Sequence, residues 1–412
     1  MPTYPNIIHE SLKIKALGPL VDVVLDDIRP VTVLVGESGS GKSLILKILA
    51  MMRHVCKKEL IRRALKISGV NKTSISIRKD SYLAFAEIGS LVGPETRIVY
   101  DLFYNDMLFY NDMPICQISL DKKGFSVHLD DVAPLDQTKP FFKIAFISDT
   151  RNLLASWARK GASIQSKILD NYFSETYNLW DEAMDAKSFT EQSIDYLNAR
   201  LLVGKNKSGW RDVVMVNNAG RKTLFEHGAS GEKASIPISI ILRYLTHGYD
   251  FEQAVRRSYN SIILDAMMGE SEDGRYFVPS EIILPFKDYY LCVHIEEPEL
   301  SLDPMTQLRF ADDLMRIMDS AVEERKSLEA SIMFTTHSPY WVTALNTIAQ
   351  EGRSKFLSWN RLGGYLIKND GTVESLRDEE SHLLMTPNMD EASAALDERY
   401  NLALEGTLHG KD

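Results

Sequence analysis

Residues 36–43 read GESGSGKS, directly after a β-branched run and at the start of a stretch whose apolar residues recur at helical spacing. The pattern G-x-x-x-x-G-K-[ST] in this context is typical of a phosphate-binding loop. Its glycines let backbone N–H groups approach phosphate oxygens, Lys42 brings positive charge to the outer phosphates, and the Ser43 hydroxyl can bind Mg²⁺. The sequence therefore predicts a nucleoside triphosphate site here.

A second run, residues 291–304 (LCVHIEEPELSLDP), places two adjacent acids at the end of an apolar strand. An acidic pair after a strand is, taken alone, most often a solvated loop. In a chain that also carries a phosphate-binding loop, Glu296 is predicted to hold Mg²⁺, usually through water. Glu297 is then predicted to orient or deprotonate the attacking water.

Residues 334–339 (FTTHSP) end another strand with a histidine. A lone histidine is usually structural or solvated, but the carboxyl edge of a parallel sheet is where such folds bind ligands. We predict that His337 contacts the γ-phosphate or the attacking water. The glycine-serine stretch at residues 226–235 (EHGASGEKAS) is by itself typical of a plain turn.

These motifs need a sheet that brings the strand ends together. Near-continuous apolar strands that precede the acids and the histidine favour a parallel sheet covered on both faces. Two short strands precede the loop, and a β-rich layer is expected from about residue 75 to 147. A helical pattern follows from 152 to about 202, and its last expected helix covers residues 191–204. The predicted fold class is α/β, with a mostly parallel core sheet, an antiparallel β layer and a helical insertion.

The expected organisation has four parts. The first part, with the glycine loop and the β-rich layer, spans residues 1–150, a helical insertion spans 151–225, a second part with the glycine-serine stretch, the acid pair and the histidine spans 226–376, and an acidic tail spans 377–412.

Composition bounds the class of protein. With 412 residues, 44% hydrophobic and 25% charged content, the chain is an ordinary folded protein. No apolar run is long enough to span a membrane, no secretory signal is expected, and three cysteines without C-x-x-C spacing fit a reducing compartment. We therefore predict a cytoplasmic protein without a membrane partner, and the net charge of -10 disfavours a chain that coats nucleic acid nonspecifically.

One segment departs from that acidic balance, because residues 53–79 are strongly basic. Three interpretations remain open: a solvated helix face, a contact to nucleic acid, or a patch that recognises an acidic protein.

The ordered set TVLVGESGSGKS, GASGEK, HIEEPELSLDP and FTTHSP resembles the Walker A, signature, Walker B with D-loop, and switch-histidine motifs of ABC-type ATPases. The combination of EEPELSLDP with TTHSP is similar to the Rad50, SMC and OLD branch. This resemblance implies Mg²⁺ binding by Ser43 and Glu296, a general base in Glu297, γ-phosphate sensing by His337, and a D-loop contact across a dimer by Asp303.

Two departures from the family pattern stand out. Ala229 occupies the place where the signature usually has serine, so the contact to a partner's γ-phosphate falls to the Ser230 hydroxyl or to backbone N–H groups at Gly231. The stretch FISDTRN, residues 146–152, lies at the approximate position of the Q-loop but contains no glutamine.

The resemblance implies ATP and Mg²⁺ as cofactors, with Glu297, His337 and Lys42 in catalysis. The nucleotide-binding residues predicted from it are Gly36, Glu37, Ser38, Gly39, Ser40, Gly41, Lys42, Ser43 and Leu44, with Ser230, Gly231, Glu232 and Asp303.

Within that branch, size and motif form look most like AAA15-type ATPase subunits of antiphage defence systems, PARIS first and Septu second. This resemblance implies a homo-oligomer of nucleotide-sandwich dimers that responds to a phage-encoded trigger protein. It also implies a separate nuclease effector, of TOPRIM type, because the stretch after His337 lacks a D-x-D cluster and is too short for a nuclease domain. The alternative is a Rad50/SMC-like ATPase of DNA repair, with DNA as partner.

Overall fold

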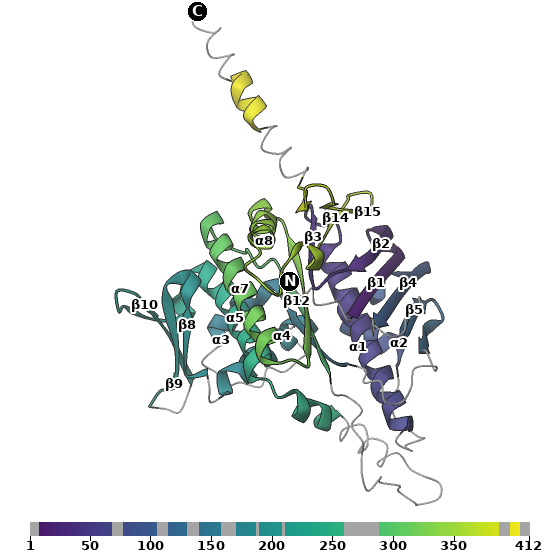
Figure 1. Ribbon diagram of the computed structural model, residues 1–412, viewed down its shortest axis with the longest axis horizontal. Helices are drawn as coiled ribbons and strands as arrows, with labels where there is room; N and C mark the ends of the chain where they lie inside the picture. Colours follow the sequence, from purple (N-terminus) through teal and green to yellow (C-terminus); the bar gives the residue numbers. More distant parts are fainter. Residues whose placement is uncertain are drawn as a thin grey trace, which may run out of the picture.

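The computed structural model describes residues 8–67, 77–104, 114–129, 140–157, 170–186, 189–207, 211–258, 288–386 and 396–403. These residues form a mixed α/β fold in which helices and two larger sheets pack around a common core (Figure 1).

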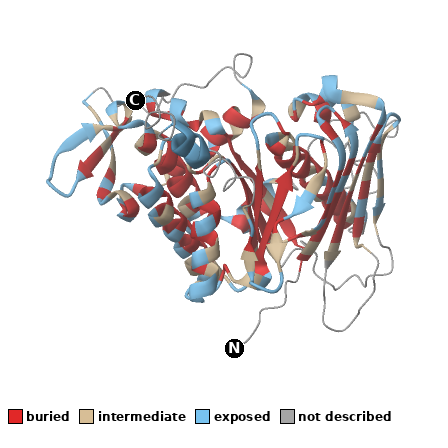
Figure 2. Ribbon diagram, turned by 90° about the horizontal axis from the view of Figure 1, so that it is seen from above, coloured by how far each residue is buried: buried red, intermediate tan, exposed pale blue. Residues whose placement is uncertain are grey.

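The central sheet has six strands, five of them parallel. Its order is β15 (Val373–Ser375), β14 (Leu362–Ile367), β3 (Val31–Gly36), β13 (Leu328–Thr336), β12 (Tyr289–Glu296) and β7 (Phe141–Ile147). Only β15 runs antiparallel to its neighbour. The strands are buried almost throughout, as Figure 2 shows in red, because helices and a second sheet exclude water from both faces.

The second sheet is the predicted antiparallel layer. Its order is β2 (Leu20–Ile28), β1 (Ile8–Leu17), β4 (Val92–Tyr104), β5 (Cys116–Asp121) and β6 (Gly124–Leu129). Helix α1 (Lys42–Ile67) contacts both this layer and the central sheet, and the short α2 (Lys79–Phe85) lies beside it (Figure 1). The helix that begins in the phosphate-binding loop is therefore held between two sheets.

A group of helices packs on the side of the central sheet away from the antiparallel layer (Figure 1). These are α3 (Leu154–Trp157), α4 (Asn171–Asp185), α5 (Ser230–Arg243), α7 (Pro304–Glu324) and α8 (Pro339–Glu351), with a 3₁₀ turn, η2 (Asp149–Leu153), between β7 and α3. Helices α7 and α8 pack against each other, and α5 packs against α4, α7 and η2.

The prediction of a helix over residues 191–204 is wrong. This segment forms β8 (Glu191–Ile194), the turn η4 (Asp195–Leu197) and most of β9 (Ala199–Lys205), which with β10 (Arg211–Asn217) and β11 (Lys222–Leu224) make a four-stranded antiparallel sheet. Asn198 adopts a left-handed conformation with φ of 50°, which ends the turn and starts β9. The stretch 151–225, expected to be a helical insertion, thus holds α4 together with this small sheet.

The basic segment 53–79 does not form one exposed face. Arg53 is fully buried beside Glu10, and residues 68–76 lie outside the described part of the chain. The predicted tail contains the small β16 (Arg377–Asp378) and β17 (Leu383–Leu384) and an exposed helical stretch at 396–403. Among the described helices, none combines the length and the apolar character that crossing a bilayer requires.

Candidate functional site

Strand register brings the predicted motifs to one edge of the central sheet. Glu296 at the end of β12 pairs with Thr335 of β13, and Thr336 pairs with Val35 of β3, one residue before the loop. All these strands are parallel, so their carboxyl ends lie at the same edge, where open α/β sheets bind ligands. The acids, the histidine and the glycine loop thus come from distant parts of the sequence to one place.

The loop at residues 36–43 is shaped by glycine. Gly41 has φ of +105°, and a Cβ there would lie 2.6 Å from Leu20 Cδ2, so a side chain does not fit. Lys42 is 5% exposed and its Nζ donates to the carbonyl oxygens of Gly36 (2.9 Å) and Glu37 (2.7 Å). Burial lowers the pKa of Lys42, while Glu297 and Glu299 act in the opposite direction. The lysine is therefore folded over its own loop, at the place where phosphate oxygens would accept the same donors.

Ser43 and Glu296 lie close together at the sheet edge, where the Ser43 hydroxyl acts to lower the pKa of the Glu296 carboxyl. Burial and the neighbouring Asp149 raise the pKa of Glu296. The Asp149 backbone N–H donates to Glu296 Oε2 at 3.3 Å, which puts the segment expected to be the Q-loop beside these two residues. A hydroxyl and a carboxylate are oxygen ligands that suit Mg²⁺, which keeps several waters and uses few protein groups.

Within the described residues, no group of three or more His, Cys, Asp or Glu side chains forms a metal site. The predicted Mg²⁺ site would thus rest on Ser43, Glu296 and phosphate oxygens. A cation there would relieve the repulsion that raises the pKa of Glu296.

Glu297 and His337 face each other, with Glu297 Oε1 3.4 Å from His337 Nε2 and both side chains about one-third exposed. Burial, aided by Lys42, lowers the pKa of His337, although Glu297 opposes the shift. Glu297 has φ of +42°, a conformation that non-glycine residues rarely adopt, and its N–H donates to the Thr335 carbonyl at 3.0 Å. The acid and the histidine are thus side by side at the mouth of the site.

Glu299, which the sequence analysis did not single out, fixes the histidine from behind. Its Oε1 accepts from the Thr336 hydroxyl (2.7 Å) and from the His337 backbone N–H (2.9 Å). Its Oε2 is buried without a hydrogen-bond partner among the described residues, and burial raises the pKa of this carboxyl. The available signal was the third glutamate of EEPE, which follows the acid pair in the same short motif.

The glycine-serine stretch begins helix α5. Ser230 is its first residue and is exposed, whereas Gly231 is buried against the loop after β12, where a Cβ would lie 2.7 Å from the Ser301 carbonyl oxygen. Glu232 Oε2 accepts from the Ala229 N–H at 2.7 Å. In the part of the chain that the structure describes, no hydrogen bond joins Ser230 or Glu232 to residues 36–44. Their predicted contact to a nucleotide held by another copy stays a prediction.

Asp303 caps helix α7, because its carboxylate accepts from the backbone N–H groups of Met305 and Thr306, both at 3.1 Å. Its predicted D-loop contact across a dimer is not tested by this cap. Met305, in the first turn of α7, is 63% exposed, and Tyr340, in the first turn of α8, is 55% exposed. Two large side chains are thus exposed to solvent at the starts of α7 and α8.

A cavity of about 610 Å³ opens between the loop and the end of β14. Its wall includes Glu37 and His337 and three residues that the sequence analysis missed, Lys368, Asn369 and Asp370. The Asn369 amide donates to Glu37 Oε2 at 2.8 Å. A polar turn directly after an apolar strand was the signal, and β14 places it at the site because it pairs with β3.

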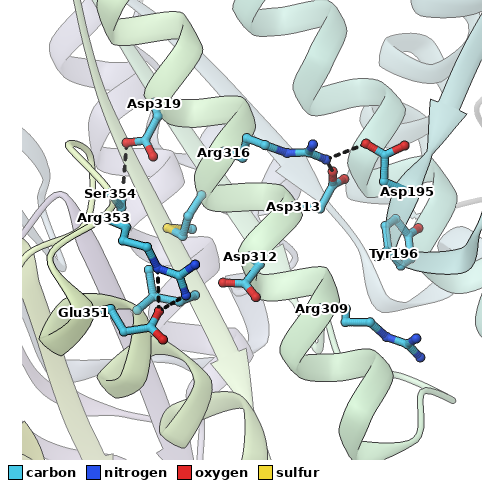
Figure 3. Close-up of a pocket in the computed structure, with 12 residues that line it drawn as sticks. Asp195, Tyr196, Arg309, Asp312, Asp313, Arg316, Asp319, Glu351, Arg353 and Ser354 are labelled. Carbon is cyan, nitrogen blue, oxygen red and sulfur yellow. Dashed lines mark hydrogen bonds and ion pairs between the residues drawn. The ribbon is translucent and has the colours of Figure 1, made fainter.

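A second cavity, of about 450 Å³, lies on the outer side of α7 (Figure 3). Several of its charges are paired with each other: Arg316 bonds Asp195 at 2.8 Å and also Asp313, while Arg353 bonds Glu351. Figure 3 shows these paired side chains pointing toward one another.

Of the predicted site residues, the structure brings together Lys42, Ser43, Glu296, Glu297 and His337. It places Gly231 against the loop that follows β12, with Ser230 and Glu232 beside it in the first turn of α5, and Asp303 at the start of α7. Their roles in binding and catalysis remain predictions.

No model of a known protein family matches the chain, and no match to a curated protein was found. Among solved structures, the chain is similar to an SMC head bound to the C-terminal winged-helix domain of ScpA, at a TM-score of 0.38 and 14% identity, covering 90% of this chain and 98% of that one. The SMC head domain from Thermotoga maritima gives a TM-score of 0.36 and 13% identity, with 90% and 99% covered.

A dimeric ATP-binding cassette in a post-hydrolysis state, bound to ADP and phosphate, gives a TM-score of 0.28 and 12% identity, with 89% and 99% covered. All three TM-scores lie below 0.5, so these likenesses carry no weight for function, which rests on the residues of the site.

Proposed function

We propose that this chain is an ATPase of the ABC type, which binds ATP at the carboxyl edge of the central sheet and hydrolyses it between two copies. The observation that carries the proposal is the register of β3, β12 and β13, which aligns the glycine loop, the acid pair and the histidine. Chemistry at a γ-phosphate requires these three kinds of group within reach of one another.

The roles of the residues follow from their chemistry. Backbone N–H groups of the loop and the Lys42 ammonium would hold the phosphates, in place of the carbonyl oxygens that Lys42 contacts. Ser43 and Glu296 would hold Mg²⁺, whose chemistry is to neutralise charge on the phosphates. Glu297 would take the proton of the attacking water, and the adjacent His337 would sense the γ-phosphate.

Assembly of two copies is supported by what the site leaves exposed. Ser230 begins α5 facing solvent, and Met305 and Tyr340 expose apolar surface on the first turns of α7 and α8. In the proposed sandwich, Ser230 and Gly231 of one copy meet the nucleotide of the other, and ATP binding favours the assembled form.

The finer proposal is an antiphage role, in which the assembly is the sensor and scaffold that holds a separate TOPRIM-type nuclease until a phage-encoded trigger releases it. Its support is a resemblance in size and general motif form, within the Rad50, SMC and OLD branch, to AAA15-type subunits, AriA of PARIS first and PtuA of Septu second. Co-expression with a nuclease encoded by the neighbouring gene tests it. A stable complex whose nuclease is released by a phage protein is expected, and a neighbouring gene unrelated to nucleases would contradict it.

The alternative is an ATPase that acts on DNA, as Rad50 and SMC proteins do. The exposed part of the basic segment supports it, since Arg62 is 52% exposed on α1. A duplex affinity that falls steeply with salt and is lost on charge reversal at Arg62 and Arg63 would favour this alternative. If these changes instead abolish the response to a trigger protein, the defence proposal gains support.

The ATPase proposal is tested with two variants of the full chain. Lys42→Ala is expected to lose ATP binding, and Glu297→Gln is expected to bind ATP but to hydrolyse it about 10²- to 10⁴-fold more slowly, because the base is removed. Mass photometry should find Glu297→Gln assembled in the presence of ATP and Mg²⁺. The mass distribution of Lys42→Ala should be the same with and without nucleotide.

The matched control is Glu252→Gln, an exposed acid that pairs with Arg256 away from the site. It should behave as the unchanged chain does. A Glu297→Gln protein that binds ATP and remains monomeric would overturn the assembly proposal.

A further inference from the structure

Arg151 is a fully buried arginine with an unusual set of partners. Its Nε donates to the carbonyl oxygen of Ala234 at 2.6 Å, and its Nη1 to those of Ser148 (3.0 Å) and Glu296 (2.6 Å). Its Nη2 donates to the carbonyl oxygen of Glu297 at 2.6 Å. Among the described residues, no carboxylate forms an ion pair with this guanidinium. One side chain therefore binds four backbone carbonyl groups and no acid directly.

These carbonyls belong to three separate segments. Ser148 precedes η2, Ala234 lies in the second turn of α5, and Glu296 and Glu297 form the tip of β12. A buried charge is costly, and an apolar side chain would fill the same space at less cost. What the guanidinium supplies instead is geometry, because its donors form a rigid planar fork that fixes several acceptors at once.

The bond to Glu297 has a particular consequence. The Glu297 backbone is in the left-handed region, with φ of +42°, and such conformations persist only where the surroundings hold them. Here the N–H of Glu297 donates to Thr335, and its carbonyl accepts from both Arg151 and the Leu300 N–H. Arg151 is thus one of the two donors that fix this carbonyl, and the one that links it to Ser148 and Ala234.

The hydrogen bond to the Ala234 carbonyl connects Arg151 to helix α5. Ala234 is one turn from Ser230, whose end of α5 faces solvent, and Gly231 packs on Ser301 in the loop after Glu297. A shift of this helix end would therefore act on the acid pair by two routes, directly through Ser301 and through the fork of Arg151.

We propose that Arg151 is a positioning residue that couples the outward-facing first turn of α5 to the backbone of Glu296 and Glu297. A ligand that contacts this turn then sets the orientation of the Glu297 carboxylate in the same copy. The inference rests on the proposed function, in which the first turn of α5 contacts the nucleotide held by a second copy. It adds that ATP bound to one copy changes the catalytic acid of the other copy through Arg151.

The test compares steady-state hydrolysis by the full chain with that of Arg151→Gln and Arg151→Lys. Both variants should lower kcat by about 10- to 100-fold, because a small misplacement of a catalytic group costs that much. The KM for ATP should stay within about threefold, since Arg151 does not contact the nucleotide loop. Lysine should not rescue kcat, because a single ammonium group cannot reach all four carbonyls.

The matched control is Arg243→Gln, at the C-terminal end of α5, where the guanidinium pairs with Asp313 away from the acid pair. Its kcat should remain within about twofold of the unchanged chain. An Arg151→Gln protein with normal kcat would overturn the inference, as would a loss of kcat in Arg243→Gln of equal size. A chain that never hydrolyses ATP would instead overturn the proposed function itself.

A second measurement does not depend on whether the Arg151 variants fold. Hydrogen exchange of the Glu297→Gln chain is compared with and without ATP and Mg²⁺. Residues 148–153 should gain protection together with residues 230–236. Protection of residues 230–236 without any change at 148–153 would contradict the coupling.

Discussion

Among the described residues, two arginines are completely buried, Arg53 and Arg151, and their partners differ in kind. Arg53, on α1, forms an ion pair with Glu10 of β1, and the hydroxyl groups of Tyr100 and Tyr290 also donate to this carboxylate. Burial alone would raise the pKa of Glu10, but the Arg53 guanidinium lowers it below its ordinary value. In this cluster, each charge has its partner.

The site is arranged differently. Burial lowers the pKa of Arg151 to about 10, and burial raises the pKa of both Glu296 and Glu299. Lys42 contacts carbonyl oxygens rather than any of these acids. Among the described residues, Lys42 and Arg151 form hydrogen bonds to backbone carbonyl groups and not to the carboxylates of Glu296 and Glu299, which is the arrangement expected if phosphates and a cation complete the proposed site. The Glu10 cluster secures the joint between the two sheets, and the site remains open to a ligand.

The largest effect should follow from breaking the Glu10 cluster. Glu10→Gln leaves Arg53 buried without its counter-charge, so the free energy of unfolding should fall by about 3–5 kcal/mol, measured by urea denaturation. ATP binding by the remaining folded protein should be unchanged, because the cluster does not touch the nucleotide loop.

The control for this experiment is Glu252→Gln, which removes an exposed i,i+4 pair with Arg256 and should cost only about 0.3–0.5 kcal/mol. If Glu10→Gln is as stable as this control, the cluster is not what stabilises the joint between the sheets.

A smaller effect, on rate rather than on stability, is expected at Glu299. Glu299→Ala removes the acceptor that holds the Thr336 hydroxyl and the His337 N–H, so kcat should fall by about 10- to 100-fold with little change in KM. Glu299→Gln keeps an oxygen in the same place and should stay within about threefold of the unchanged chain.

The comparison between these two variants separates the hydrogen bonds of Glu299 from its charge. Equal losses in both variants would mean that the charge beside Lys42 matters and that the positioning of His337 does not. Steady-state ATPase assays with both variants decide between the two.

The smallest effect, on the free energy of unfolding, should come from adding a hydroxyl group at the N-cap position of α5. Ala229 precedes the first turn of α5 without a side-chain cap, although Glu232 already accepts its N–H. Ala229→Ser would complete a capping box and should raise the free energy of unfolding by about 0.5–2 kcal/mol. Ala219→Ser, in the exposed turn after β10, is the control and should be neutral. A thermal melt that finds no gain for Ala229→Ser would mean that this turn is held by other contacts.

The sequence predicted the parts of the site whose chemistry is local. GESGSGKS encodes a loop, a lysine and a hydroxyl within eight residues, and EE after an apolar strand places two acids together. The layered α/β architecture followed from apolar strands of the parallel type and from alternation in the antiparallel layer. The segment at 191–204 was misassigned because its apolar residues fit helical spacing over a short window, while pairing with β10 is a contact that spacing does not encode.

The sequence by itself determined which groups are predicted to meet a phosphate and a cation, because each motif lies within one short stretch of the chain. Only the tertiary structure decided which of the remaining residues act with them. Arg151, Glu299 and the turn at residues 368–370 reach the site through strand register and through burial. Most of their partners lie far away in the sequence, and those of Arg151 are backbone carbonyl groups, which no residue type identifies.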